Sequence, residues 1–142
     1  MAPRTLTGRV MATKAMLDAT VGFLALENEW SVQTFAVPDI TAITRWLASA
    51  QAPAAVVCYV GSKWWPQDLE RRQARIAVVA KMAAANDTKE GIDAVLDQID
   101  AIVLAVDGQQ SGGTTWRAES DDVLPSRDGS VNALISFTVW DT

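Results

Sequence analysis

Three aspartates recur at a spacing that could gather carboxylate oxygens around a metal ion. Asp93, Asp97 and Asp100 would share one face of a helix, and carboxylate oxygens are the ligands that Mg²⁺ and Ca²⁺ prefer. The residues between them, however, repeat apolar side chains on the opposite side of the same helix. This pattern is typical of a helix with one buried and one solvated face. We therefore expect a solvated acidic face and no metal site.

Few residues could serve nucleophilic catalysis or proton transfer. The chain has no histidine and one cysteine, Cys58, which excludes Ser-His-Asp and Cys-His systems and an intrachain disulfide. Cys58 lies in the continuously apolar run 54–60, where a thiol acts as a small buried hydrophobic group. The glycine-rich segment 107–114 follows an expected helix and precedes an expected strand, the reverse of the order in a phosphate-binding loop. These observations predict a protein that is not an enzyme and has no cofactor.

Tryptophan is the most informative residue type in the sequence. There are six, and although burying one is worth up to about 5 kcal/mol, a small core rarely needs so many. Trp30, Trp46 and Trp116 lie in or beside expected helices and strands, so core packing accounts for them.

Trp64 and Trp65 are adjacent, in a segment that we expect to be irregular between two strands. Neighbouring side chains on an extended chain point to opposite faces, so the two cannot enter one core in a simple way. Exposed aromatic residues with nearby arginines are characteristic of protein interfaces. We predict that one indole closes over its own sheet and the other inserts into a neighbouring subunit, with the alternative that both cover the open end of the same sheet. The predicted subunit interface comprises Trp64, Trp65, Arg71, Arg72, Arg75 and Trp140.

The hydrophobic pattern predicts a chain of alternating helices and strands. Helices are expected over 6–27, from the capping residue Asp39 to about Gln51, and from a capping box at Asp87 and Glu90 to just before Gly108. The expected strands are 30–37, 54–60, a segment within 71–83, 114–120 and 131–142. This order predicts an α+β fold with a single layer of mixed, mostly antiparallel sheet of about five strands and helices packed on one face.

Length and composition predict one soluble domain over residues 1–142. Apolar residues make up 49% and charged residues 20%, which is globular composition. No apolar stretch is long enough to span a bilayer, and the first residues lack a secretory signal pattern, so the expected site of synthesis and assembly is the cytoplasm. The net charge of -5 argues against sequence-independent nucleic-acid binding.

Three segments together resemble a known protein family. They are the strand from Pro53 to Gly61, the basic-start strand and long amphipathic helix from Arg71 to Val106, and the closing aromatic-rich strand from Ala133 to Trp140. In element order and length they are similar to the small tail-terminator and tail-completion proteins of long-tailed phages, in particular those of Mu-like prophages. The resemblance lies in hydrophobic patterns, so it transfers no role to an individual residue.

The resemblance implies a structural protein of the virion tail or neck, assembled in the bacterial host cytoplasm. Its copies would form a ring, typically a hexamer, on the head-proximal end of the tail tube, stop tube polymerisation and present a surface to the head connector or stopper protein. DNA would pass through the lumen without specific binding, which suits an acidic chain. The polar segments 107–114 and 120–130 are the expected docking loops.

Two other interpretations stay open. One is a small enzyme or ligand-binding α+β domain with an aromatic pocket lined by Tyr59, Trp64 and Trp65. The other is a different head-tail joining subunit of the same particle. A ligand-binding domain would be a monomer, whereas a terminator would form discrete rings.

Overall fold

A computed structural model gives the structure of the protein. It describes residues 6–27, 31–35, 39–51, 53–65, 68–82, 89–111, 114–125 and 131–141. Within some of the helices and strands it describes the backbone alone.

Three helices are described, each in a predicted place. They are α1 (Leu6–Glu27), α2 (Ile40–Ser49) and α3 (Lys89–Val106). The predicted cap of α2 is confirmed, since the Asp39 carboxylate accepts a hydrogen bond of 3.1 Å from the amide of Ala42. Of the capping box predicted for α3, Asp87 lies outside the described residues. The chain leaves α3 through Gly108, whose φ of +79° suits glycine at a helix end.

In the described residues, six strands form one mixed sheet in the order β1-β2-β3-β6-β5-β4. Their bounds are β1 (Ser31–Phe35), β2 (Ala54–Trp65), β3 (Asp68–Lys81), β4 (Gln110–Ser111), β5 (Thr114–Pro125) and β6 (Val131–Asp141). The α+β class and the mixed sheet are confirmed, but the prediction of about five strands missed β4. The pair β1 and β2 is parallel and the other described pairs are antiparallel.

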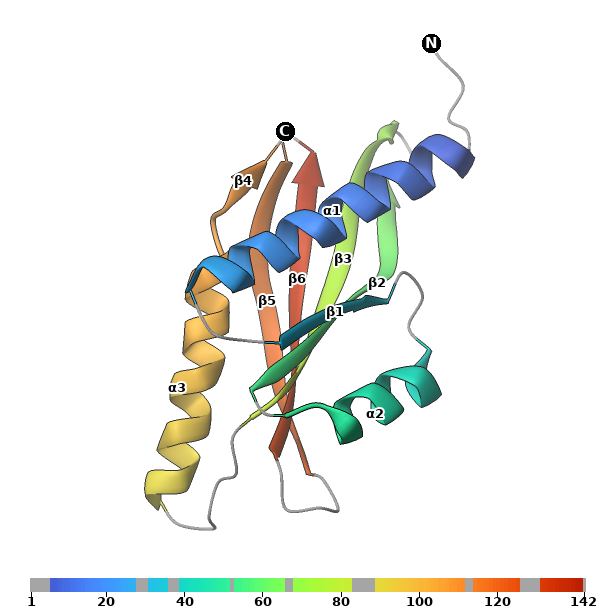
Figure 1. Cartoon of the computed structure of the whole chain (residues 1–142). Helices are drawn as coiled ribbons and strands as arrows, with labels where there is room; N and C mark the ends of the chain where they lie inside the picture. The colour runs from blue at the N-terminus through green and yellow to red at the C-terminus, as the bar shows by residue number, and fades with distance from the viewer. Residues whose placement is uncertain are drawn as a thin grey trace.

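The expectation that all helices pack on one face is wrong. α1 and α3 cover one face, which we call the first face, where Leu17, Ile99 and Ile76 belong to the larger buried cluster. α2 packs on the second face, where Ile43 and Leu47 lie against Val56, Cys58 and Ala77. Figure 1 shows α1 crossing the strands, with α3 along one side of the sheet and α2 apart from both.

β2 has buried apolar side chains on both of its faces, so both faces of the sheet need a covering helix. Its successive residues Val56 and Val57 are fully buried, and they belong to different clusters on opposite faces of the sheet. A continuously apolar run such as 54–60 is typical of a strand that is covered on both faces. An amphipathic pattern shows that α2 buries one side, but it does not say against which face of the sheet, and for this reason the prediction of a single covered face was wrong.

Candidate subunit interface

Trp64 and Trp65 lie at the end of a strand, which corrects the prediction of a segment between strands, and the pairing register shifts between the two residues. β2 runs to Trp65 and β3 starts at Asp68, so the two strands form one long hairpin. Trp64 pairs with Arg72, and Trp65 pairs with Asp68. Pairing along the hairpin gives these residues an extended conformation, which local composition around Pro66 did not reveal.

Strand register brings the six predicted interface residues to one end of the sheet. Arg71 and Arg72 lie early in β3, beside the tryptophan end of β2. On the other side of β3, Gln73 pairs with Trp140 of β6. Arg75 is two residues further along β3, and its side chain is exposed. The structure describes only the backbone at Trp64, Trp65, Arg71, Arg72 and Trp140, so their side-chain roles stay predictions.

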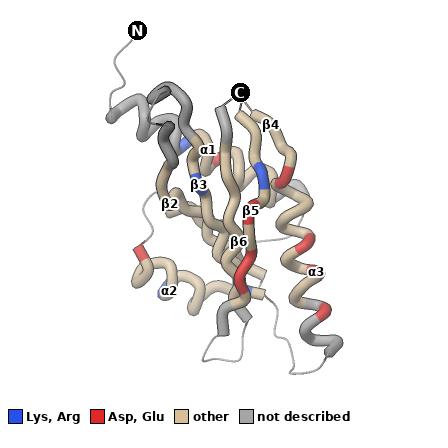
Figure 2. The backbone as a smooth tube through the Cα atoms, turned by 180° about the vertical axis from the view of Figure 1, so that it is seen from behind, with Lys and Arg blue, Asp and Glu red and all other residues tan. Residues whose placement is uncertain are grey.

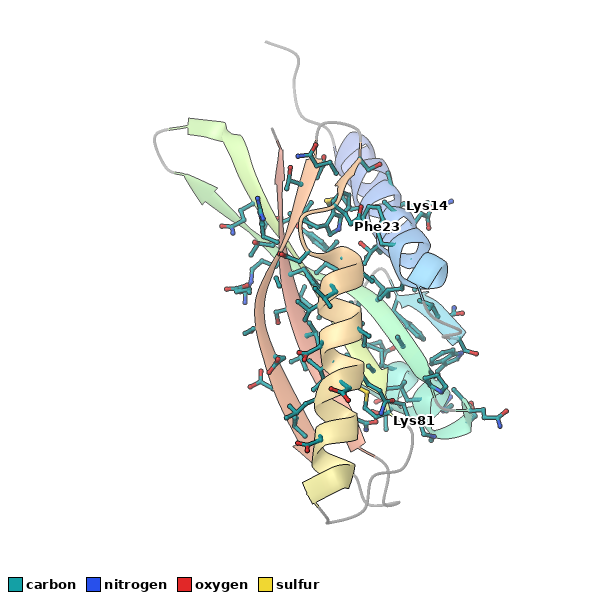
Figure 3. The ribbon with its side chains drawn as sticks, turned by 90° about the vertical axis from the view of Figure 1, so that its left-hand side faces the viewer. Lys14, Phe23 and Lys81 are labelled. Atoms are coloured by element: carbon teal, nitrogen blue, oxygen red, sulfur yellow. The ribbon has the colours of Figure 1, made fainter. Side chains whose placement is uncertain are left out.

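The end of the hairpin extends beyond its neighbouring strands. In the described residues, β1 pairs with β2 only over 54–58, and β6 pairs with β3 only from Gln73 onward. We call residues 61–65 and 68–72 the hairpin arm. Figure 3 shows this green hairpin leaving the rest of the sheet and projecting to one side. An arm of this kind presents unpaired strand edges that another chain can contact.

A β-bulge at the base of the arm explains its change of direction. Tyr59 pairs with Ile76 and Gly61 with Arg75, so Val60 is an extra residue on β2. Such a residue bends the strand and increases its twist. Gly61 has a φ of +135°, a conformation that side chains rarely adopt. Glycine at this position therefore allows the arm to depart from the sheet.

A second bulge, on β5, places a carboxylate near Arg75. Ala118 pairs with Phe137 and Ser120 with Ser136, which leaves Glu119 as the extra residue. Its Oε2 lies 3.9 Å from Nε of Arg75, and both side chains are about half exposed. An exposed ion pair at this distance contributes at most about 1 kcal/mol to stability. Arg75 is thus held only weakly and remains accessible.

The residues of the alternative pocket are only partly described. Tyr59 is half-buried against the core on the first face, and its hydroxyl shares a hydrogen bond with the Ser62 hydroxyl. The side chains of Trp64 and Trp65, which would complete an aromatic pocket, lie outside the described part of the structure. Tyr59 thus has a structural role in the described part.

The other residues singled out in the sequence have structural surroundings. Asp93, Asp97 and Asp100 are exposed on α3, as predicted for a solvated face. Cys58 is buried, and burial raises the pKa of its thiol. Among the described residues no three potential ligands gather to hold a metal ion. Of the three predicted core tryptophans, Trp116 is 1% exposed and Trp46 is half-buried against the α2 cluster, while Trp30 lies outside the described residues.

Several surface features were missed in the sequence. Two leucines of α3 lie outside its buried side, since Leu96 is 46% exposed and Leu104 is 78% exposed. The predicted loop 120–130 is also partly wrong, because β5 continues to Pro125. Leu104 could have been noticed, since it follows Asp97 and Asp100 at helical spacing. The Glu119 bulge has no comparable signal, because it depends on pairing with β6.

None of the described helices has the length and apolar character needed to cross a membrane. No model of a known protein family matches the chain, and a search of curated proteins finds no matching sequence.

Proposed function

We propose that the protein is a structural subunit of a long-tailed phage, a tail terminator that forms a ring on the head-proximal end of the tail tube. In this role it stops tube polymerisation and joins the tail to the head connector or stopper protein. The proposal rests on the resemblance of its three sequence segments to that family and on one structural observation. That observation is the hairpin arm, which carries four of the six predicted interface residues, Trp64, Trp65, Arg71 and Arg72, beyond the neighbouring strands.

The hairpin arm suits contact between subunits for a physical reason. A hairpin that outruns its sheet gains no packing from further strands, and exposed strand edges are normally avoided unless a partner covers them. Trp64, Trp65, Arg71 and Arg72 all lie in this arm. Tryptophan and arginine are the residue types most enriched at interface hot spots. Insertion of the arm into the next copy would cover the strand edges of the arm and stabilise the contact between the two copies.

A ring explains why one chain needs two different contact surfaces. Copies that associate head to tail use a projecting surface on one copy and a receiving surface on the next, and the ring closes when the rotation between copies allows it. The remaining surfaces at the two ends of the ring are then free to bind tube and connector. The acidic balance of the chain, -5, suits a ring through which DNA passes without being retained.

The test is assembly with and without the tube protein of the same particle. Mass photometry and negative-stain microscopy should show discrete rings, alone or on the ends of tubes, and tubes grown with the protein should stop at a defined end. A protein that stays monomeric and leaves tube growth unchanged would contradict the proposal. Rings that bind connector but never tube ends would instead indicate another head-tail joining subunit, and turnover of a metabolite would indicate an enzyme.

A further inference from the structure

The outward side of α3 carries exposed leucines among its aspartates. At about 100° per residue, Leu96 and Leu104 lie in the same stripe as the three aspartates, opposite the buried Ile99 and Ile102. We call this surface the helix stripe, and it comprises Asp93, Leu96, Asp97, Asp100 and Leu104. Its aspartates form no ion pair with the described residues. Exposed leucines beside unpaired carboxylates leave both apolar area and charge available to a partner.

A basic surface lies on the other side of the molecule. Arg75 of β3 and Arg117 of β5 both pair with Thr138 of β6, so the two arginines flank it on the second face of the sheet. α2 covers this face only around Val56 and Cys58. Figure 2, which views the molecule from behind, shows β5 and the upper parts of β3 and β6 with no helix in front of them. We call the surface formed by the exposed Arg75 and Arg117, on either side of the buried Thr138, the arginine face.

The two surfaces point in opposite directions. α3 packs its buried side on the first face, so the helix stripe looks away from the sheet, whereas the arginine face is the opposite surface of that sheet. The two surfaces therefore cannot meet within one chain. They can meet when two copies stack in the same orientation, so that the helix stripe of one copy faces the arginine face of the next.

We propose that the helix stripe of one copy docks on the arginine face of the next copy in the ring. Charge selects this arrangement over the alternatives. Two helix stripes facing each other would bring three aspartates against three, and two arginine faces would bring arginine against arginine. Only the front-to-back contact joins opposite charges, and it is of the head-to-tail kind that rings require.

The acidic residues near the arginine face are compatible with this docking. Glu119 holds Arg75 through a long, exposed ion pair that a neighbouring carboxylate can replace. Asp122 lies further along β5, on the same face as Leu134. It places negative charge away from the two arginines, so the neighbouring stripe is expected to lie toward the Arg75 end. This polarity fixes the orientation of one copy on the next.

The inference rests on the proposed function, and charge reversal tests it separately. D97K/D100K and R75E/R117E each alter one exposed surface, and each should weaken self-association by about 100-fold because like charges then face each other. The chain with all four substitutions should recover at least about tenfold, measured by sedimentation or by assembly on tube protein. D18K and R45E, at exposed positions on α1 and α2, are matched controls that should assemble as the unmodified chain does.

Cross-linking distinguishes head-to-tail from symmetric contact. L104C/S120C, which keeps both arginines and places the second thiol at the exposed Ser120 on the same face of β5, should give a ladder of covalent oligomers with a flexible bismaleimide. L104C alone should not, because the arginine face then has no thiol and Cys58 is buried. Dimers from L104C alone, normal assembly of both charge-reversed variants, or no recovery in the four-substitution chain would each overturn the docking inference. If the unmodified chain assembles on tubes in those cases, the proposed function stands. If it never assembles, both proposals fail.

Discussion

The indole Nε1 of Trp116 donates a 2.9 Å hydrogen bond to Oγ1 of Thr20, which joins β5 to α1 across 96 positions of sequence. The Thr20 hydroxyl in turn donates to the carbonyl of Met16 over 2.8 Å. Phe23 meets the Trp116 ring edge to face, with 5.0 Å between centroids. All the polar atoms of this contact are buried and satisfied, so it fixes how α1 lies on the sheet.

Thr20→Val should destabilise the fold by about 1 to 3 kcal/mol, because valine fills the same space but leaves the buried indole N–H without an acceptor. Thr20→Ser retains the hydroxyl, so it should lose clearly less stability than Thr20→Val. Urea unfolding followed by circular dichroism measures both values. Equal losses for the two variants would show that the hydrogen bond contributes little.

Gly61→Ala should destabilise the protein by about 1 to 3 kcal/mol and alter the hairpin arm, because alanine is strained at a φ of +135°. Gly22 in α1 is the matched control, since a Cβ there also meets no neighbouring atom but the backbone is helical. Gly22→Ala should stabilise by about 0.5 to 1 kcal/mol. Chemical denaturation measures the change in the free energy of unfolding for each variant. Changes of opposite sign support the bulge assignment, and changes of the same sign contradict it.

The side chain of Lys81, on β3, hydrogen-bonds the end of α2 and so connects this helix to the sheet. Its Nζ donates to the carbonyls of Leu47 and Ala50, over 2.9 and 3.1 Å, at the end of α2, where unpaired carbonyls attract a positive charge. Lys81→Met should lower the free energy of unfolding by about 1 to 2 kcal/mol. It should also raise the rate of amide hydrogen exchange in α2 more than in α3. Lys81→Arg, which keeps the charge, should be milder. Uniform exchange in both helices would argue against a local fastening role.

Cys58 predicts a fall in stability at alkaline pH. Because burial raises its folded-state pKa, the thiol keeps its proton after the unfolded chain has begun to lose it. The contribution of Cys58 to stability is therefore complete below about pH 8.5, the unfolded pKa, and declines as the pH rises above it. Cys58→Ala should remove this part of the slope, measured as the urea midpoint between pH 7 and 10. An unchanged slope in the variant would contradict the assignment.

Trp64→Ala and Trp65→Ala test the hairpin arm directly. At least one should weaken self-association by the about 2 to 4 kcal/mol typical of an interface hot spot, while far-ultraviolet circular dichroism of the monomer stays unchanged. Ile40→Ala, at an exposed apolar position on α2, is the control and should assemble normally. If both tryptophan variants form rings as the unmodified chain does, the arm is not the subunit contact.

The parts of the fold that the sequence predicted are those determined by local periodicity. The repeat of apolar residues predicted α1 and α3, and the apolar run around Cys58 predicted a strand with a buried thiol. The extension of β2 through Trp65 depends on pairing with β3, so local composition could not reveal it. β4 is two polar residues held by Thr114 and Thr115 of β5, and no hydrophobic pattern marks it.

The candidate site was predicted less completely, for the same reason. Residue types identified Trp64, Trp65 and the arginines, and their common location at one end of the sheet follows from register. The relation of Arg75 to Glu119 and Arg117 is set by a bulge and by β6 lying between two strands. Such relations arise from contacts between distant segments, which one sequence does not display.

The position of β6 also has a consequence for how the protein is made. It comes last of the six described strands along the chain, yet it lies between β3 and β5, and its Trp140 pairs with Gln73. During synthesis the edge of β3 that pairs with β6 therefore stays unpaired until β6 has left the ribosome. Closure over so many intervening residues is slow, and an open strand edge is exposed to other nascent chains in the meantime. Chaperone access at that stage is thus expected to affect the yield of native protein.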